Sequence, residues 1–284
     1  MTKVITLFFC TLSFTSNVLA DLPNLGSLFS RNPNRVLNPD LKYLPLSENE
    51  SDHEIYVAQE RLSYINDQPK EYLHFAGKIG NSGSLPFVLF SRFDSNGESQ
   101  AYQLTSCFLS FNPRTLETLD EWLFEDRQFS TINGCRIRPA STIEFDTIHQ
   151  HEHAQEIASY ELREGRYNGT LLRASQKVSY ALVDSDVILE RNRDRIPSYY
   201  FASGMLVSPG YYDDYRARTP GQEFDITGLA DGIYVIILQV NEARHFTESN
   251  YTNNKLYVRI SLSTDSSGLR TVTILNQNYN HRGM

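Results

Sequence analysis

Two apolar runs near the carboxyl end constrain the fold more than any other part of the sequence. Ile233 to Val240 is almost wholly aliphatic, and Lys255 to Leu262 alternates polar with apolar side chains. Both have the length and composition of β-strands. Tyrosine (17) and phenylalanine (16) are abundant beside a single tryptophan, which also favours strands. With turn signals between short apolar runs, the sequence predicts an all-β fold, a sandwich or irregular barrel of short strands with long loops and one short helix.

Shorter runs extend this pattern. Tyr72 to Ile79 predicts a strand that ends in a Gly/Asn turn, and Pro86 to Phe93 predicts the returning strand of the same hairpin. A short amphipathic helix is predicted over 115–126, because leucines and a tryptophan recur there at helical spacing after a proline. Further extended segments are predicted at 143–153, 159–162, 177–182 and 271–275.

Domain organisation follows from changes of composition along the chain. Residues 1–20 combine an early lysine, an apolar stretch too short to span a bilayer, and a Val-Leu-Ala ending, which is typical of a cleaved signal peptide. The prediction is a secreted or periplasmic protein without a membrane span. Residues 21–70 predict an irregular segment with one edge strand at most, and residues 71–284 predict a β domain.

The charge balance argues against one class of partner. The chain has 26 Lys and Arg against 34 Asp and Glu, a net charge of −8. No nucleic-acid partner is therefore predicted, since such binding works through a basic surface. An acidic surface would concentrate a cationic substrate, although acidity also serves solubility alone.

The cysteines predict one disulfide. Once the signal peptide is removed, only Cys107 and Cys135 remain, and an even pair in an oxidising compartment is expected to be bridged. The bridge would close a loop that carries the predicted helix. One bridge cannot hold a chain of this size, so a conventional hydrophobic core is expected.

Three alternating histidines, His149, His151 and His153, indicate a metal site. On a strand, side chains two residues apart point to the same face. Three imidazoles on one face suit Cu²⁺ or Zn²⁺ and leave coordination positions open. A solvated polar strand is the alternative, but the whole chain has only seven histidines. The spacing decides neither between copper and zinc nor between an enzyme and a metal carrier.

Further motifs follow the histidines in a fixed order. They are Tyr160-Glu161-Leu162, Ser208-Pro209-Gly210-Tyr211-Tyr212-Asp213-Asp214-Tyr215, Asp225-Ile226-Thr227, Gly232-Ile233-Tyr234 and Glu248-Ser249-Asn250-Tyr251-Thr252-Asn253-Asn254. This order resembles the catalytic domain of the lysyl oxidase family, whose motifs read His-Gln-His-x-His, Ser-Pro-Gly-x-Tyr-Asp-x-Tyr and Glu-Ser-x-Tyr-Thr-Asn-Asn. The resemblance covers residues 21–262 and is densest from 143 onward.

The resemblance implies a copper-dependent amine oxidase with a lysine tyrosylquinone built from one lysine and one tyrosine of the chain. The tyrosine of the family motif matches Tyr215, and Lys177 is the only lysine between the histidines and Tyr215. Such an enzyme converts a primary amine to an aldehyde and releases ammonia and hydrogen peroxide. Asp213 is a candidate for the base that the reaction needs, and a turn-capping aspartate is the alternative. The implied partners are molecular oxygen and an amine, either small or a protein-bound lysine.

The family also implies a calcium site. Its ligands are an N-terminal Asp-Leu pair and the Glu-Ser-Asp-Tyr-Thr-Asn-Asn loop. The matching residues here are Asn24, Leu25, Glu248, Asn250, Asn253 and Asn254. Two carboxylates have become amides, which lowers the expected Ca²⁺ affinity, and an Asn-rich turn is the alternative.

Two other functions remain open. One is a non-catalytic secreted β-sandwich that binds a metal or adheres to a surface. The other is a zinc hydrolase that uses the same histidines. That hydrolase would lack a positioned base, because Glu152 should point away from the histidines on a regular strand. Visible absorbance from a quinone would exclude both.

Overall fold

The computed structural model describes residues 36–47, 53–64, 68–93, 99–108, 111–122, 131–140, 143–148, 150–174 and 179–280. The predicted signal peptide and the predicted site residues Asn24, Leu25, His149 and Lys177 lie outside these residues. In the part of the chain described, no helix is long and apolar enough to cross a membrane.

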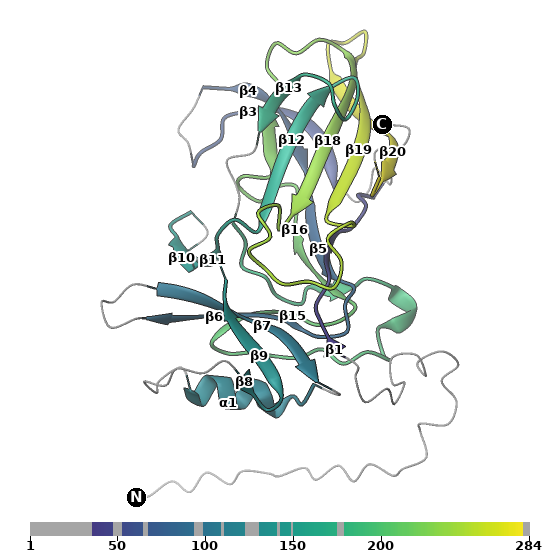
Figure 1. The fold of residues 1–284 in the computed structure, drawn as a ribbon. Coiled ribbons are helices and arrows are strands. Elements are labelled where there is room, and N and C mark those ends of the chain that lie inside the picture. Colours follow the sequence, from purple (N-terminus) through teal and green to yellow (C-terminus); the bar gives the residue numbers. More distant parts are fainter. Residues whose placement is uncertain are drawn as a thin grey trace, which may run out of the picture. The chain divides into compact units, whose positions relative to one another are not determined.

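A five-stranded antiparallel sheet, here the long sheet, contains the two most apolar runs (Figure 1). Its strands, in spatial order, are β13 (Leu171–Ala174), β12 (Ala158–Glu164), β18 (Gly232–Val240), β19 (Lys255–Thr264) and β20 (Arg270–Asn278). The strands predicted at 233–240 and 255–262 are therefore confirmed as β18 and β19. Buried and more exposed residues alternate along most of β19, so one face of the sheet packs inward.

Two smaller sheets pack against the long sheet. The Tyr215 sheet contains β14 (Asp186–Val187), β16 (Tyr211–Tyr215), β5 (Gly77–Asn81) and β2 (Leu41–Tyr43). The β4 sheet contains β17 (Glu223–Asp225), β4 (Lys70–Phe75) and β3 (Ile55–Glu60). The main hydrophobic core joins all three sheets through residues such as Ile79, Phe224 and Ile236. This layering is that of a sandwich, and the all-β prediction is confirmed.

The remaining large sheet, here the disulfide sheet, has a core of its own. Its strands are β15 (Gly204–Val207), β6 (Phe87–Phe93), β7 (Ser99–Phe108), β9 (Cys135–Pro139), β8 (Thr131–Ile132) and β1 (Val36–Leu37). Cys107 and Cys135 are cross-strand partners on β7 and β9 and form the predicted disulfide. The predicted helix is α1 (Arg114–Trp122), which buries Leu116 and Leu119 in this second core.

The structure corrects three local predictions. The predicted hairpin of 72–79 with 86–93 is wrong. The first segment is interrupted at Ala76 and forms two strands, and β4, β5 and β6 belong to three different sheets. Residues 36–60 contain three strands rather than one at most. No strand covers the described part of 177–182, where Tyr180 forms only an isolated bridge to Ala154. In each case pairing with distant segments decides the local structure.

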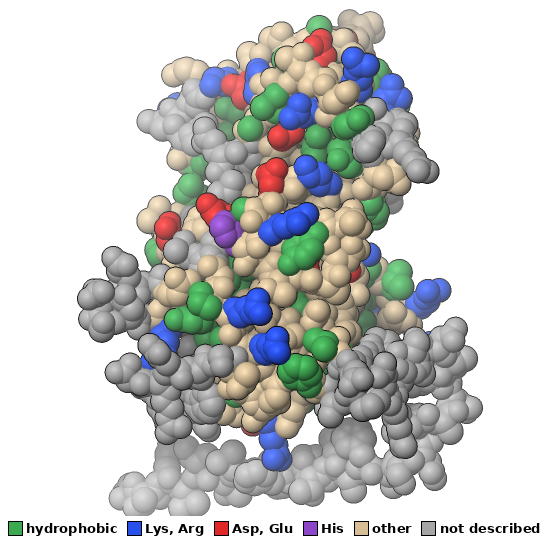
Figure 2. Space-filling model, in the orientation of Figure 1, with side chains coloured by type: hydrophobic (Ala, Val, Ile, Leu, Met, Phe, Trp, Pro, Cys, Tyr) green, Lys and Arg blue, Asp and Glu red, His purple; other side chains and the backbone are tan. Residues whose placement is uncertain are grey.

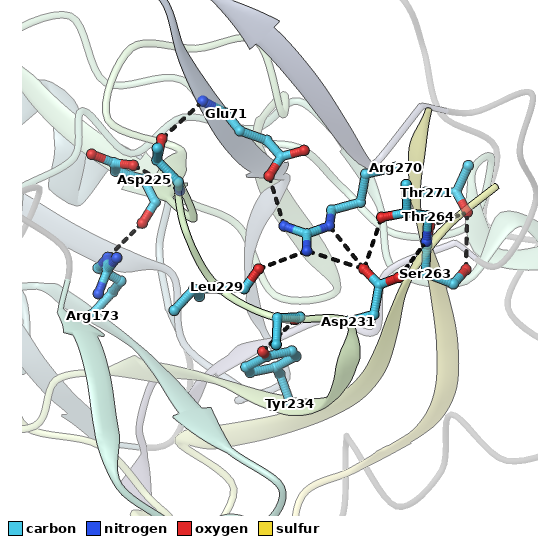
Figure 3. A network of polar contacts seen from close by, with 12 residues as sticks. Glu71, Arg173, Asp225, Leu229, Asp231, Tyr234, Ser263, Thr264, Arg270 and Thr271 are labelled. Carbon is cyan, nitrogen blue, oxygen red and sulfur yellow. Dashed lines mark hydrogen bonds and ion pairs between the residues drawn. The ribbon is translucent and has the colours of Figure 1, made fainter. Parts of the chain in front are cut away.

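A polar network ties the far end of the long sheet to the β4 sheet (Figure 3). The Arg270 guanidinium, only 11% exposed, lies 2.7 Å from the Glu71 carboxylate and 3.0 Å from Asp231. It also donates to the Leu229 carbonyl, and Asp231 accepts from the Thr264 backbone N–H. Because these partners come from β4, the turn before β18 and the end of β19, the network fixes the relative position of the two sheets.

Candidate active site

The histidine motif lies on a short hairpin, here the histidine hairpin. Its strands are β10 (Ile143–Asp146) and β11 (His151–Ala154), so the extended segment predicted over 143–153 is instead two strands and a turn. Gln150 has a positive φ of 61°, and β11 begins only at His151. The predicted alternation therefore applies to His151 and His153. His149 lies outside the described residues.

The imidazoles of His151 and His153 meet at their Nε2 atoms, which are 3.0 Å apart. His153 is fully buried, and its Nδ1 lies 3.1 Å from the Ser179 hydroxyl. In the tautomer that donates Nδ1–H to Ser179, the Nε2 lone pair is directed toward His151. Two converging imidazole nitrogens with such an outer partner fit a Cu²⁺ or Zn²⁺ ion. Among the described residues, no three His, Cys, Asp or Glu side chains gather into a metal-binding group.

Tyr215 is the third side chain of the group that His151 and His153 form. It lies on β16, 8% exposed, and its hydroxyl is 3.4 Å from Nε2 of His153. The backbone N–H of Ala181 donates to the same hydroxyl at 2.9 Å. The ring of Tyr180 packs on that of Tyr215, with centroids 4.1 Å apart. These contacts hold the phenol of Tyr215 against the histidines.

A buried polar cluster fixes Tyr180 in turn. The Gln222 amide donates to the hydroxyls of Tyr180 (2.8 Å) and Tyr160 (3.0 Å). Both tyrosines are fully buried, and desolvation raises the pKa of Tyr160 above its usual range, so its phenol stays neutral. Tyr160 belongs to the Tyr160-Glu161-Leu162 motif, but no local sequence signal indicates that Gln222 bridges it to Tyr180.

Gly77 permits this packing, and we predict that Gly77→Ala is destabilising. A Cβ at residue 77 would lie 2.3 Å from the Tyr180 hydroxyl and 2.9 Å from the Gln222 amide oxygen. Overpacking a closed core should lower the free energy of unfolding by about 1–3 kcal/mol, measured by urea denaturation. Gly80→Ala on the same strand is the matched control, because its nearest neighbour is the flexible end of Ile188. Equal losses in both variants would contradict the prediction.

Asp213 is a buried carboxyl beside this group. Only 3% of the residue is exposed, and burial raises its pKa to about 8, although Ser185 and two backbone N–H groups favour the charged form. The Ser185 hydroxyl lies 3.3 Å from Oδ1, while Oδ2 has no hydrogen-bond partner among the described residues. A carboxyl with this pKa can exchange a proton near neutral pH.

One cavity connects these residues. It has a volume of about 700 Å³, and His151, Asp213 and Tyr215 line it. Its other walls are mainly small and apolar, with Val183 and Met205 among them. Glu152 also contributes to the cavity wall, and the prediction that its side chain points away from the histidines stays a prediction. β11 pairs with β10 in regular antiparallel register over His151–Ala154, as that prediction assumes.

Three of the predicted calcium residues, Glu248, Asn253 and Asn254, gather around Asp40 and Leu41. Glu248 accepts hydrogen bonds from the Leu41 backbone and from the side-chain amide of Asn254, and the Asn253 amide donates to Asp40 at 3.1 Å. Side-chain oxygens of Asp40, Asn253 and Asn254 are buried without a hydrogen-bond partner among the described residues. Such a set of oxygens fits a hard cation.

Two details of the calcium prediction change. Asn250 is only partly buried, and its side-chain oxygen accepts from the backbone N–H and hydroxyl of Thr252, as in a local turn. Asp40 was not among the predicted calcium ligands. Asp40-Leu41 is nevertheless an Asp-Leu pair, and it has the aspartate carboxylate that Asn24-Leu25 lacks. The carboxylate was the signal that could have found it.

The fold and site thus define an all-β protein with a histidine–tyrosine centre beside a cavity. The family model described as lysyl oxidase matches residues 124–272, more than half of the chain. The chain belongs to the lysyl oxidase family.

Individual relatives agree with this assignment. Lysyl oxidase homolog 1 of Homo sapiens is 34% identical over 118 residues, which are 41% of this chain and 20% of that protein. Protein-lysine 6-oxidase of Homo sapiens is 32% identical over 118 residues, 41% of this chain and 27% of that protein. Protein-lysine 6-oxidase of Sus scrofa is 32% identical over 120 residues, 41% of this chain and 46% of that protein. The matched segments therefore span less than half of each of these relatives.

Proposed function

We propose that this protein is a copper-dependent amine oxidase that converts a primary amine to an aldehyde, with release of ammonia and hydrogen peroxide. The observation that carries the proposal is that Nε2 of His153 lies 3.0 Å from Nε2 of His151 and 3.4 Å from the Tyr215 hydroxyl, beside a cavity that His151 and Tyr215 line. The family membership and the relatives named protein-lysine 6-oxidase support the reaction type.

The residues present fit the two cofactors that the family implies. His149, His151 and His153 would hold copper, and Lys177 and Tyr215 would form the lysine tyrosylquinone. When bound, copper with molecular oxygen supplies the oxidation of the tyrosine, and the quinone accepts the electrons of the amine.

The chain's own residues supply position and proton transfer. Ser179 orients His153, while Tyr180 and the Ala181 N–H orient Tyr215. Asp213, as a carboxylate, removes the proton from the carbon next to the substrate amine. The apolar cavity walls exclude water from the reacting atoms.

The remaining assignments follow from this proposal. The chain is exported after removal of residues 1–20, and its partners are molecular oxygen and an amine, either small or a protein-bound lysine. A Ca²⁺ ion is held by Glu248, Asn253 and Asn254 with Asp40 and Leu41, which supports the loop between β18 and β19.

The visible spectrum of the copper-loaded protein tests the proposal. The wild type is expected to show a quinone band that shifts on addition of phenylhydrazine. Lys177→Ala and Tyr215→Phe are each expected to bind copper and to lack the band. A colourless, unreactive wild type with full copper occupancy would overturn the oxidase and leave a metal-binding β-module.

A further inference from the structure

A cluster of ionisable side chains in the β4 sheet has no part in the chemistry proposed above. His74 lies at its centre on β4 and is 4% exposed, with Tyr56 of β3 and Glu223 of β17 as cross-strand neighbours. On the face drawn in Figure 2, by contrast, acidic and basic side chains are spread over the surface rather than gathered into one patch. Burial of a histidine costs free energy unless its ring nitrogens have partners, so these partners indicate what His74 does.

Both ring nitrogens of His74 face acceptors. Nδ1 lies 3.1 Å from the carbonyl oxygen of Ala217, and Nε2 lies 2.6 Å from Oε1 of Glu60. A carbonyl oxygen only accepts, so Nδ1 must carry a proton. A second proton must then lie between Nε2 and the Glu60 carboxyl group, because two lone pairs at 2.6 Å would repel each other. The ring of Tyr56 stacks on that of His74, with centroids 4.7 Å apart, and limits its rotation.

His74 holds one end of the segment that follows Tyr215. This segment, residues 216–222 and here the β16–β17 link, joins β16 to β17. Ala217, which accepts the hydrogen bond from His74, is buried two residues after Tyr215. Thr219, further along the link, lines the same cavity as Tyr215. A shift of the link would therefore move a wall of the cavity and the end of the strand that carries Tyr215.

The same strand holds the other end of the link. The backbone N–H of Phe75 donates to the Gln222 carbonyl at 3.0 Å. The Gln222 side-chain amide donates to the hydroxyl of Tyr180, whose ring packs on that of Tyr215. β4 thus fixes both ends of the link, and the second contact is a backbone hydrogen bond that does not titrate. The side chain of His74 is the contact that a substitution or a change of pH can release.

We propose that His74 is a positioning residue for Tyr215, which holds the β16–β17 link through Ala217 as long as Nε2 and Glu60 share a proton. The inference goes beyond the proposed function and rests on it only for the role of Tyr215. Loss of the shared proton leaves one proton for two acceptors, so the ring can donate to the Ala217 carbonyl or to Glu60 but not to both. The hold on the link should therefore weaken as the pH rises.

The other ionisable groups around His74 do not produce this pH dependence. They are Tyr56, Tyr72 and Glu223 on the three strands, with Tyr64 and Arg218 in contact with them. Burial raises the pKa of Tyr56 and Tyr64, so both phenols stay neutral, and Arg218 keeps its charge. Burial also raises the pKa of Glu223, and its ionisation at higher pH would favour the charged ring and strengthen the hold, which is the opposite sign.

Two amide substitutions separate the Ala217 contact from the effect of burial. The amide nitrogen of His74→Asn is as many bonds from the backbone as Nδ1 and can donate to Ala217, whereas that of His74→Gln matches Nε2 and reaches toward Glu60. Hydrogen exchange of residues 216–222, measured by mass spectrometry, should be about tenfold faster in His74→Gln and near the wild-type rate in His74→Asn. The value of kcat for amine oxidation should fall about three- to tenfold in His74→Gln only. β18 is the internal control, since general destabilisation would speed its exchange as well.

Glu60→Gln tests the shared proton. Glu60 is 42% exposed, so this substitution should not disturb folding. The new amide donates to a neutral Nε2, which leaves the Nδ1 proton for Ala217 at any pH. After correction for intrinsic exchange rates, protection of the link should fall in the wild type as the pH rises across the range in which histidines titrate. In Glu60→Gln the protection should stay level.

The outcomes separate this inference from the proposed function. Equal exchange in His74→Asn and His74→Gln, or the same pH dependence in the wild type and Glu60→Gln, would overturn the inference. Faster exchange in His74→Gln with unchanged quinone formation and kcat would overturn the positioning of Tyr215. A wild type without quinone, but with the expected exchange pattern, would instead overturn the oxidase and keep His74 as the residue that holds the link.

Discussion

A His151→Ala variant is expected to bind copper at least about 100-fold more weakly than the wild type, to lack the quinone band and to lose amine oxidation. His151 contributes one of the two Nε2 atoms that meet 3.0 Å apart. Loss of an outer partner of a metal ligand typically costs 10–100-fold in affinity, so loss of a ligand should reach at least the upper end. Without copper, Tyr215 is not converted, and the spectrum and the activity should disappear together.

The exposure of His151 makes this variant informative. Its side chain is exposed, so alanine should leave the unfolding transition in place, and equilibrium dialysis then reports on metal affinity alone. His245→Ala is the control, because His245 is also exposed and pairs with Glu156 outside the cavity. Removal of copper from the wild type by a chelator before quinone formation should reproduce the phenotype. Full copper binding and normal colour in His151→Ala would exclude it as a ligand.

The parts of the fold that could be predicted are those in which one short segment carries the whole signal. β18 is apolar over nearly its full length, β19 alternates polar with apolar side chains, and α1 shows its leucines at helical spacing. The cysteine pair required only the count of cysteines and the compartment. In these cases tertiary structure reinforces what the local sequence favours.

The predictions that were wrong concern strands whose pairing partners are distant in the sequence. Residues 72–93 contain a turn signal, but β5 pairs with β16 and β2, and β6 pairs with β7 and β15. The apolar side chains on these strands suit any buried neighbour, so a local turn does not fix the pairing. β1 and β2 have only two and three residues, and their pairing with β7 and β5 decides their structure.

The candidate site likewise contains residues that sequence motifs predict and residues that they do not. The motifs identified His151, His153, Asp213 and Tyr215. The structure brings His151, Asp213 and Tyr215 to one cavity and places the buried His153 in contact with His151 and Tyr215. The motifs gave no sign of Gln222 and Tyr180, because their role depends on packing behind Tyr215. The alternation predicted over 149–153 was extended across a hairpin turn, since β11 begins only at His151.

An Asp213→Asn variant is expected to lose about 100- to 10,000-fold in kcat while it retains copper and the quinone band. The carboxylate is the basic form, and the pKa of Asp213 is about 8, so the wild-type rate should rise with pH and level off above pH 8. The amide cannot accept the proton, so the residual rate of the variant should lack this rise. Ser185→Ala removes a donor that favours the charged form, and it should move the inflection to higher pH.

The pH dependence of folding stability gives a second test of Asp213, with a predicted direction. Between about pH 4 and pH 8 the carboxyl group is ionised in the unfolded chain and protonated in the folded one. The contribution of this carboxyl group to the free energy of unfolding is therefore fully present below pH 4. It falls as the pH rises to 8, by up to about 1.4 kcal/mol per pH unit. Asp213→Asn should flatten this part of the pH–stability curve, measured by urea denaturation. A variant with near-normal kcat and a flattened curve would show that Asp213 is a buried structural carboxyl and that the base lies elsewhere.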